Sequence, residues 1–220
     1  MMYDKALVYI HGKGGTADSA NEFKSLFTEY DIYGFDYKSE NPWEAEIEFK
    51  EYFTDLAKKY SIITVIATSL GAYFLMISGV QAHIHRAYFV SPIVNMERLI
   101  QDMMKRGHVS NEELENKKII QLSTYENLSW EYYTWVKQHP IVWSVPTFIL
   151  YGENDNFQTI DTINGFAELV GAEVTVMLNG EHWFHTPEQN EFRRNWLRRI
   201  IEEDNNGNKS LCGERFTTGI

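Results

Sequence analysis

The feature that most constrains the fold is a β-branched run that ends in a serine flanked by small residues. Residues 62–67 (Ile-Ile-Thr-Val-Ile-Ala) have the length of a strand, and Thr-Ser-Leu-Gly-Ala follows at 68–72. The run predicts a buried strand, and the apolar stretch Ser69–Ala82 predicts a buried helix directly after it. In a small-x-Ser-x-Gly turn, the residues two before and two after the serine must be small, because larger side chains would collide there. Ala67 and Gly71 meet this requirement.

Ser69 is therefore a candidate nucleophile. A turn of this kind holds the serine in unfavourable backbone angles between a strand and a helix. The first turn of the helix then offers free N–H groups and the positive end of the helix dipole to developing negative charge. A serine that merely caps a buried helix is the simpler interpretation of the same pattern. The strong strand before Ser69 favours the nucleophile.

Short apolar runs alternate with helical patterns along most of the chain. Besides 62–67, strands are predicted at 6–10, 32–37, 87–90, 147–151 and 173–178. Helical patterns cover about 19–30, 43–60, 159–170 and 188–203. Strand alternating with helix predicts the α/β class, with a mainly parallel, doubly wound sheet of about six strands and helices on both faces.

Residues 92–145 interrupt this alternation, because the stretch is too long for a simple crossover. It contains helical patterns at Met96–Arg106 and Glu112–Leu122, followed by an aromatic segment. We interpret it as a helical lid inserted into a single domain, and we expect Trp130 and Trp135 to contact the substrate. An extra helical layer without gating is the alternative.

The domain is expected to cover residues 1–203. Residues 204–220 turn polar and Gly-rich, which predicts a flexible tail. The single cysteine, Cys212, lies in this tail, so no intrachain disulfide is expected.

Charge and hydropathy exclude some classes of partner. Lys and Arg total 20 against 31 Asp and Glu, which gives a formal net charge of -11. Such a balance argues against nucleic acid or an anionic membrane as the main partner. No apolar run approaches the roughly 20 residues of a membrane span. Residues 6–10 are of strand length and meet a Gly-rich turn, unlike a signal peptide. A cytoplasmic protein is expected.

A Gly-rich loop, His11-Gly12-Lys13-Gly14-Gly15, follows the first predicted strand. Acyl transfer needs two backbone donors aimed at the oxyanion, and glycines let a backbone approach the substrate closely. We expect one donor to be the N–H of Leu70, after the candidate nucleophile, and the other to be that of Lys13, with Gly14 as the alternative. Neither a complete phosphate loop nor a complete dinucleotide fingerprint is present, which disfavours nucleotide binding.

A candidate acid lies in Tyr151-Gly152-Glu153-Asn154-Asp155, just beyond the predicted strand at 147–151. The carboxyl ends of strands are where α/β sheets place functional groups, and a carboxylate there can orient an imidazole. We favour Asp155, with Glu153 as the alternative. A turn or helix-cap aspartate would have the same pattern.

A candidate base follows the last predicted strand, in Asn179-Gly180-Glu181-His182-Trp183-Phe184-His185. Histidine suits a general base near neutral pH. We favour His182, while His185 is a competitor on the same loop. Trp183 is a candidate substrate contact. The remaining histidines show no metal-ligand pattern, so neither a metal nor a cofactor is expected.

The order Ser69, Asp155, His182 is the order of an α/β-hydrolase triad, and each residue follows a predicted strand. The motifs at 67–71 (Ala-Thr-Ser-Leu-Gly), 152–155 (Gly-Glu-Asn-Asp) and 180–184 (Gly-Glu-His-Trp-Phe) resemble those of the α/β-hydrolase superfamily over residues 5–201. Ala67 departs from the usual glycine. The resemblance implies a compact member, with an eight-stranded fold trimmed to six, and hydrolysis of esters or related acyl bonds.

The chain is thus predicted to be a serine hydrolase that acts on a carboxylic ester. The aromatic lid and the lack of a basic cluster in the sequence favour a small or medium apolar acyl ester as the small-molecule substrate. Thioester or amide cleavage is the alternative within enzymes. A non-catalytic protein that binds a small ligand in the same pocket is the alternative outside them.

Overall fold

A six-stranded parallel sheet organises the protein, for which the computed structural model describes residues 4–123 and 126–205. The order across the sheet is β2-β1-β3-β4-β7-β8. The strands are β1 (Lys5–Ile10), β2 (Asp31–Phe35), β3 (Ile62–Thr68), β4 (Arg86–Val90), β7 (Thr147–Gly152) and β8 (Glu173–Met177). Every neighbouring pair is parallel, so all six strands end at the same edge. The prediction of a mainly parallel sheet of about six strands is confirmed.

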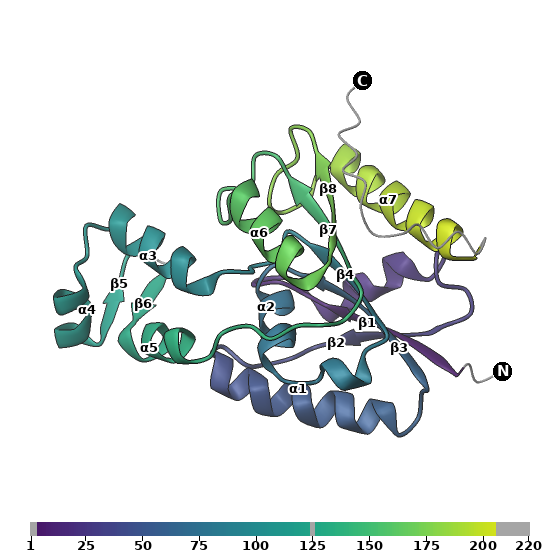
Figure 1. Cartoon of the computed structure of the whole chain (residues 1–220), viewed down its shortest axis with the longest axis horizontal. Coiled ribbons are helices and arrows are strands. Elements are labelled where there is room, and N and C mark those ends of the chain that lie inside the picture. Colours follow the sequence, from purple (N-terminus) through teal and green to yellow (C-terminus); the bar gives the residue numbers. More distant parts are fainter. Residues whose placement is uncertain (1–3, 124–125, 206–220) are drawn as a thin grey trace.

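Helices cover both faces of the sheet. One face packs against α1 (Pro42–Ala57), α2 (Leu70–Ile77) and α6 (Ile160–Val170), and the other packs against the 3₁₀ helix η1 (Ala17–Phe23) and α7 (Pro187–Asn205). Figure 1 shows α1 and α7 on opposite sides of the sheet. Side chains alternate between the faces, as the strand pleat requires. In β1, Val8 belongs to the core beneath α1, whereas Leu7 belongs to the core beneath α7.

Two predicted helices are shorter than the sequence suggests. The stretch predicted as a helix at 19–30 forms η1 and then turns, although Phe27 N still donates to Phe23 O at 3.1 Å. The helix after Ser69 ends at Ile77, because Gly79 adopts a positive φ of 70°. A separate 3₁₀ turn, η2 (Gln81–His83), follows.

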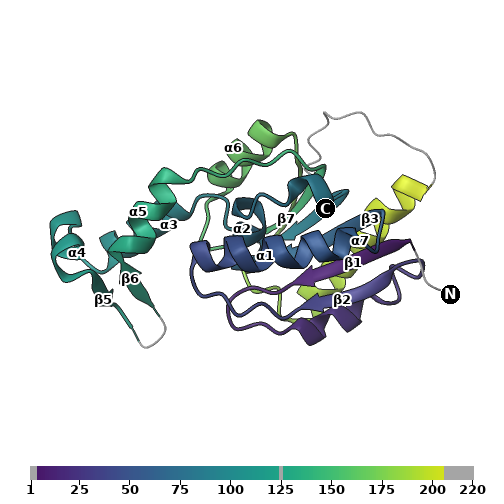
Figure 2. The same ribbon diagram turned by 90° about the horizontal axis from the view of Figure 1, so that it is seen from below.

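Residues 92–145, called the cap below, form α3 (Met96–Arg106), α4 (Asn111–Lys117), the hairpin strands β5 (Ile119–Gln121) and β6 (Asn127–Ser129), and α5 (Trp130–Gln138). The cap projects to one side of the sheet in both views, with α4 and β5 farthest out (Figures 1 and 2). The predicted helix Glu112–Leu122 is wrong in its second half. Lys118 ends α4 with a φ of 64°, and the residues after it pair antiparallel with β6.

None of the helices within the described ranges is long and apolar enough to cross a membrane. Helix α7 ends at Asn205. The rest of the predicted tail at 204–220, with Cys212, lies outside the described residues.

Candidate active site

Ser69 stands on a strained turn between β3 and α2. Its φ of 51° and ψ of -118° lie in a region that residues other than glycine rarely adopt. The backbone is held there from two sides, since Ser69 N donates to Val90 O at 3.1 Å and Ser69 O accepts from Ile93 N at 3.3 Å. Neighbouring structure must over-determine such a conformation, and strain of this kind concentrates at functional sites. The predicted turn is present, with the serine side chain buried.

Gly71 shows why the residue two after the serine must be small. A Cβ built on Gly71 would lie 2.2 Å from the carbonyl oxygen of His11. The first turn of α2 therefore packs directly against the backbone that begins the Gly-rich loop. Ala67, two residues before the serine, is fully buried between β1 and β4.

We expect Gly71→Ala to lower the free energy of unfolding by about 2 kcal/mol or more, because the clash is with backbone atoms that have no room to move. Gly165→Ala in α6 is the control, since nothing lies within 4 Å of a Cβ built there. That control should stabilise the protein by about 0.5–1 kcal/mol. Urea denaturation of both variants measures the difference. Equal stability of the two variants would contradict the close approach of α2 to the loop.

Ser69, His182 and Asp155 form a buried hydrogen-bonded chain. Ser69 Oγ donates to His182 Nε2 at 2.8 Å, and His182 Nδ1 donates to Asp155 Oδ2 at 2.7 Å. The side chains of His182 and Asp155 are 2% and 1% exposed. Each of the three residues follows a different strand, β3, β8 or β7, and all strands end at one edge. The structure thus brings together the three residues that the sequence singles out.

The remaining oxygen of Asp155 is also satisfied. Its Oδ1 accepts backbone N–H bonds from Phe157 at 2.8 Å and Gln158 at 3.2 Å. These two bonds fix the carboxylate against the loop, so that Oδ2 is left to accept from His182. A carboxylate held in this way can orient an imidazole and stabilise its cation.

The two alternative residues have other partners. Glu153 Oε2 accepts from Asn179 N at 2.9 Å, which ties the loop after β7 to the loop after β8. The side chain of His185 is 62% exposed and lies 3.4 Å from the carboxylate of Glu181. Neither residue therefore takes part in the series of hydrogen bonds from Asp155 through His182 to Ser69.

The Gly-rich loop lies against Ser69. A Cβ built on Gly12 would be 3.1 Å from Ser69 Cβ. His11 fastens this loop, because its Nδ1 donates to Gly12 O at 2.8 Å and its ring stacks on Tyr37 at 4.4 Å. Lys13 is the next residue of the loop. Leu70 is the first residue of α2, where helix N–H groups have no intrahelical partner. An oxyanion hole made by the Lys13 and Leu70 N–H groups stays a prediction.

The aromatic residues predicted to contact the substrate lie in two places. Trp183 is 56% exposed and meets the His182 ring edge-on at 5.3 Å. Trp130 packs on Tyr133, and Trp135 stacks on His139 at 3.9 Å, so the ring contacts of these two tryptophans are in and just after α5. Their contact with a substrate stays a prediction.

Sequence reasoning missed the aromatic residues that join the cap to the core. Tyr132 of α5 meets Trp43 of α1 at 6.2 Å. Burial raises the pKa of Tyr132 well above its usual value, with smaller contributions from the neighbouring Tyr73 and Tyr37. Tyr73 is one helical turn after Ser69, a spacing that could have marked it from sequence. Through Tyr132, α5 contacts the beginning of α1.

Gln158 is a second residue that the sequence did not mark. Its side chain is buried, and its Oε1 accepts from Val94 N at 3.2 Å and Asn95 N at 2.9 Å. It thereby connects the first residues of the cap to the loop that carries Asp155. No local pattern indicates this role, because the two segments are more than 60 residues apart.

Across residues 4–123 and 126–205, no group of three or more His, Cys, Asp or Glu side chains is placed to hold a metal ion. No protein-family model matches the chain, and the search of curated proteins finds no match. Solved structures do match. Est1E from Butyrivibrio proteoclasticus is 12% identical, with a TM-score of 0.70 over 93% of this chain and 89% of that one.

Two further solved structures agree with this match. Alpha/beta hydrolase domain-containing protein 10 from mouse is 15% identical, with a TM-score of 0.72 over 90% of each chain. The Pyrococcus furiosus esterase Pf2001 is 17% identical, with a TM-score of 0.59 over 96% of this chain and 84% of that one. Together with the parallel sheet, these similarities show that the chain has the α/β-hydrolase fold. The resemblance noted in the sequence is confirmed at the level of the fold.

Proposed function

We propose that the protein is a serine hydrolase that cleaves a carboxylic ester, with Ser69 as nucleophile, His182 as general base and Asp155 as the orienting acid. The observation that carries this proposal is the buried hydrogen-bonded chain from Asp155 through His182 to Ser69. The strained turn at Ser69 supports it, because a turn of this kind places the serine at the edge where the strands end. The names of the structural neighbours, a hydrolase-domain protein and an esterase, also favour hydrolysis.

The proposed reaction has two steps. His182 Nε2 takes the proton from Ser69 Oγ as the oxygen attacks the ester carbonyl, and the imidazolium then protonates the leaving alcohol. A water molecule that gives its proton to His182 attacks the acyl-enzyme and releases the acid. Asp155 holds Nδ1–H of the imidazole throughout, which keeps Nε2 free for the proton transfers.

The Lys13 and Leu70 N–H groups are proposed to bind the oxyanion. Their positions support this role, because one is in the loop against Ser69 and the other begins α2. A backbone donor aimed at the oxyanion is worth about 2.7–4 kcal/mol of transition-state stabilisation in such sites. The N–H group of the Gly-rich loop should therefore contribute about 10²–10³-fold to kcat, less than a side chain of the triad.

The cap is proposed to border the substrate site as a lid. Gln158 fastens its first residues to the Asp155 loop, and Tyr132 packs on Trp43 of α1. The first of these contacts links the cap to a loop that carries a residue of the proposed triad.

The assay that tests the proposal compares p-nitrophenyl esters of two, four and eight carbons with a matched thioester and a matched anilide. We expect turnover of at least one ester and slower turnover of the anilide. A folded protein that cleaves none of these compounds would favour the non-catalytic alternative. Cleavage of the thioester alone would move the proposed substrate to that class.

In the same assay, we expect Asp155→Asn to lower kcat by about 10⁴-fold, because an amide cannot hold the imidazole in the correct tautomer. Glu153→Gln is the matched control, since that carboxylate bonds to Asn179 N instead of to His182. Its kcat should stay within about threefold of wild type. A larger loss of kcat in Glu153→Gln than in Asp155→Asn would assign the role of the triad acid to Glu153.

A further inference from the structure

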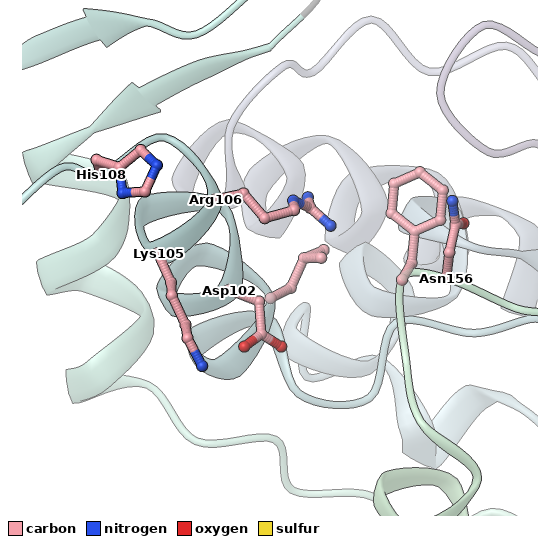
Figure 3. A pocket seen from close by; sticks show the side chains of 7 residues that line it. Asp102, Lys105, Arg106, His108 and Asn156 are labelled. Carbon is pink, nitrogen blue, oxygen red and sulfur yellow. The ribbon is translucent and has the colours of Figure 1, made fainter.

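A cavity of about 560 Å³ opens between α3 of the cap and the loop that carries Asp155. It is lined by Leu99, Asp102, Lys105 and Arg106 of α3, by His108 just after that helix, and by Asn156 and Phe157 of the loop. Figure 3 shows the guanidinium of Arg106 directed across the cavity toward Asn156. The cavity thus joins a cap helix to the two residues that follow the proposed acid.

Four polar side chains that line this space, those of Lys105, Arg106, His108 and Asn156, have no partner among the described residues. Within the part of the chain that the structure describes, neither Arg106 nor Asn156 has a side-chain hydrogen bond or an ion pair. Asp102, the carboxylate in the lining of the cavity, lies 3.9 Å from Arg98 on the same helix. A planar guanidinium and an amide present N–H donors in a geometry that suits a carboxylate.

The apolar wall of the cavity leads to the triad. Phe157 lines the cavity, and its ring packs on His182 at 4.4 Å. Leu99, on the α3 side, is largely buried. A ligand that fills the cavity would therefore contact the aromatic ring that packs on His182.

We propose that this cavity binds a carboxylate carried by the substrate at a distance from the scissile ester. Arg106 and Asn156 donate to the carboxylate, and Phe157 and Leu99 contact the apolar chain that joins it to the ester. This inference rests on the proposed hydrolase function and narrows its substrate to esters that carry a second, anionic group.

Two matched ester pairs test the proposal and distinguish the two sides of the ester. Mono-p-nitrophenyl suberate and p-nitrophenyl octanoate differ in a carboxylate on the acyl side. 4-Carboxyphenyl acetate and phenyl acetate differ in one on the alcohol side. We expect Arg106→Gln to lower kcat/KM about tenfold for the charged member of one pair, and to leave the neutral member within about twofold.

Lys117→Gln is the control, because it removes a cation from the cap that already pairs with Glu113 on α4. Lys117→Gln should leave kcat/KM unchanged for all four esters. Arg106→Lys should recover part of the loss, since it keeps the charge but not the planar fork. The preference for the charged ester should also shrink at high salt. Equal losses on charged and neutral esters, or no loss on either charged ester, would overturn the proposal.

Failure of the hydrolase proposal can be told apart from failure of this one. Calorimetric titration of the wild type, Arg106→Gln and Lys117→Gln proteins with suberate and with 4-hydroxybenzoate measures binding without turnover. If no ester is cleaved but one of these anions binds and loses about tenfold in affinity only in Arg106→Gln, the hydrolase proposal fails and the anion site stands. If neutral esters are cleaved and no anion depends on Arg106, the anion site fails alone.

Discussion

Ser69→Ala is expected to lower kcat for ester hydrolysis by about 10⁶-fold, because the acyl-enzyme cannot form without the Ser69 hydroxyl. Nothing else in the site replaces it. His182 Nε2 bonds to Ser69 Oγ, so the base would have only water to act on. Steady-state turnover of the best p-nitrophenyl ester measures the loss.

Ser91→Ala is the matched control for this prediction. Ser91 follows β4 as Ser69 follows β3, is fully buried, and has a positive φ of 44°. Its hydroxyl has no hydrogen-bond partner among the residues described. We expect Ser91→Ala to keep kcat within about threefold of wild type. Comparable losses in the two variants would indicate that the loss reflects damage to the sheet edge and not removal of a nucleophile.

His182→Ala is expected to lower kcat by a similar factor of about 10⁶, since the serine and its base act as one unit. Loss of the imidazole leaves the Ser69 hydroxyl without an acceptor and the Asp155 carboxylate without a donor on Oδ2. The same ester assay measures this loss across a range of pH.

His185→Ala is the control on the same loop. That side chain is mostly exposed and contacts Glu181, so its removal should change kcat by less than about twofold. Full turnover in His182→Ala together with loss in His185→Ala would transfer the role of base to His185. Loss of turnover in both variants would indicate that the loop is disrupted. A circular dichroism melt of each variant distinguishes such a loss of stability from a loss of catalysis alone.

The proposed triad could be predicted from sequence because the geometry of a parallel sheet is simple. Buried strands appear as short apolar runs, and the carboxyl ends of neighbouring parallel strands meet at one edge. Residues just after 62–67, 147–151 and 173–178 therefore had to converge. The choice of Asp155 over Glu153 depended on which carboxylate the loop turns inward, and the sequence left that choice open.

The cap was harder to predict, since its contacts depend on how it folds back on the sheet. The sequence indicated α3 correctly, but it extended the next helix through Leu122. A lysine at positive φ, Lys118, ends that helix, and no residue-type rule marks it in advance. The aromatic pattern also pointed to Trp130 and Trp135, whereas the residue of α5 that meets α1 is Tyr132.

The cavity beside Asp155 could not be predicted from the sequence, for the same reason. Arg106 and Asn156 are 50 positions apart, and only the path of the cap brings them to one cavity. The sequence shows no basic cluster, and an apolar ester was expected on that ground. The two cations that line the cavity, Lys105 and Arg106, change this expectation although the chain as a whole is acidic.

Covalent labelling of the wild-type protein with a fluorophosphonate, followed by peptide mass mapping, tests the nucleophile most directly. We expect one adduct, on the Ser69 hydroxyl, that is absent in Ser69→Ala and forms far more slowly in His182→Ala. A folded wild-type protein that gains no adduct, or gains one elsewhere while Ser69 stays unmodified, would contradict the central claim that Ser69 is the nucleophile.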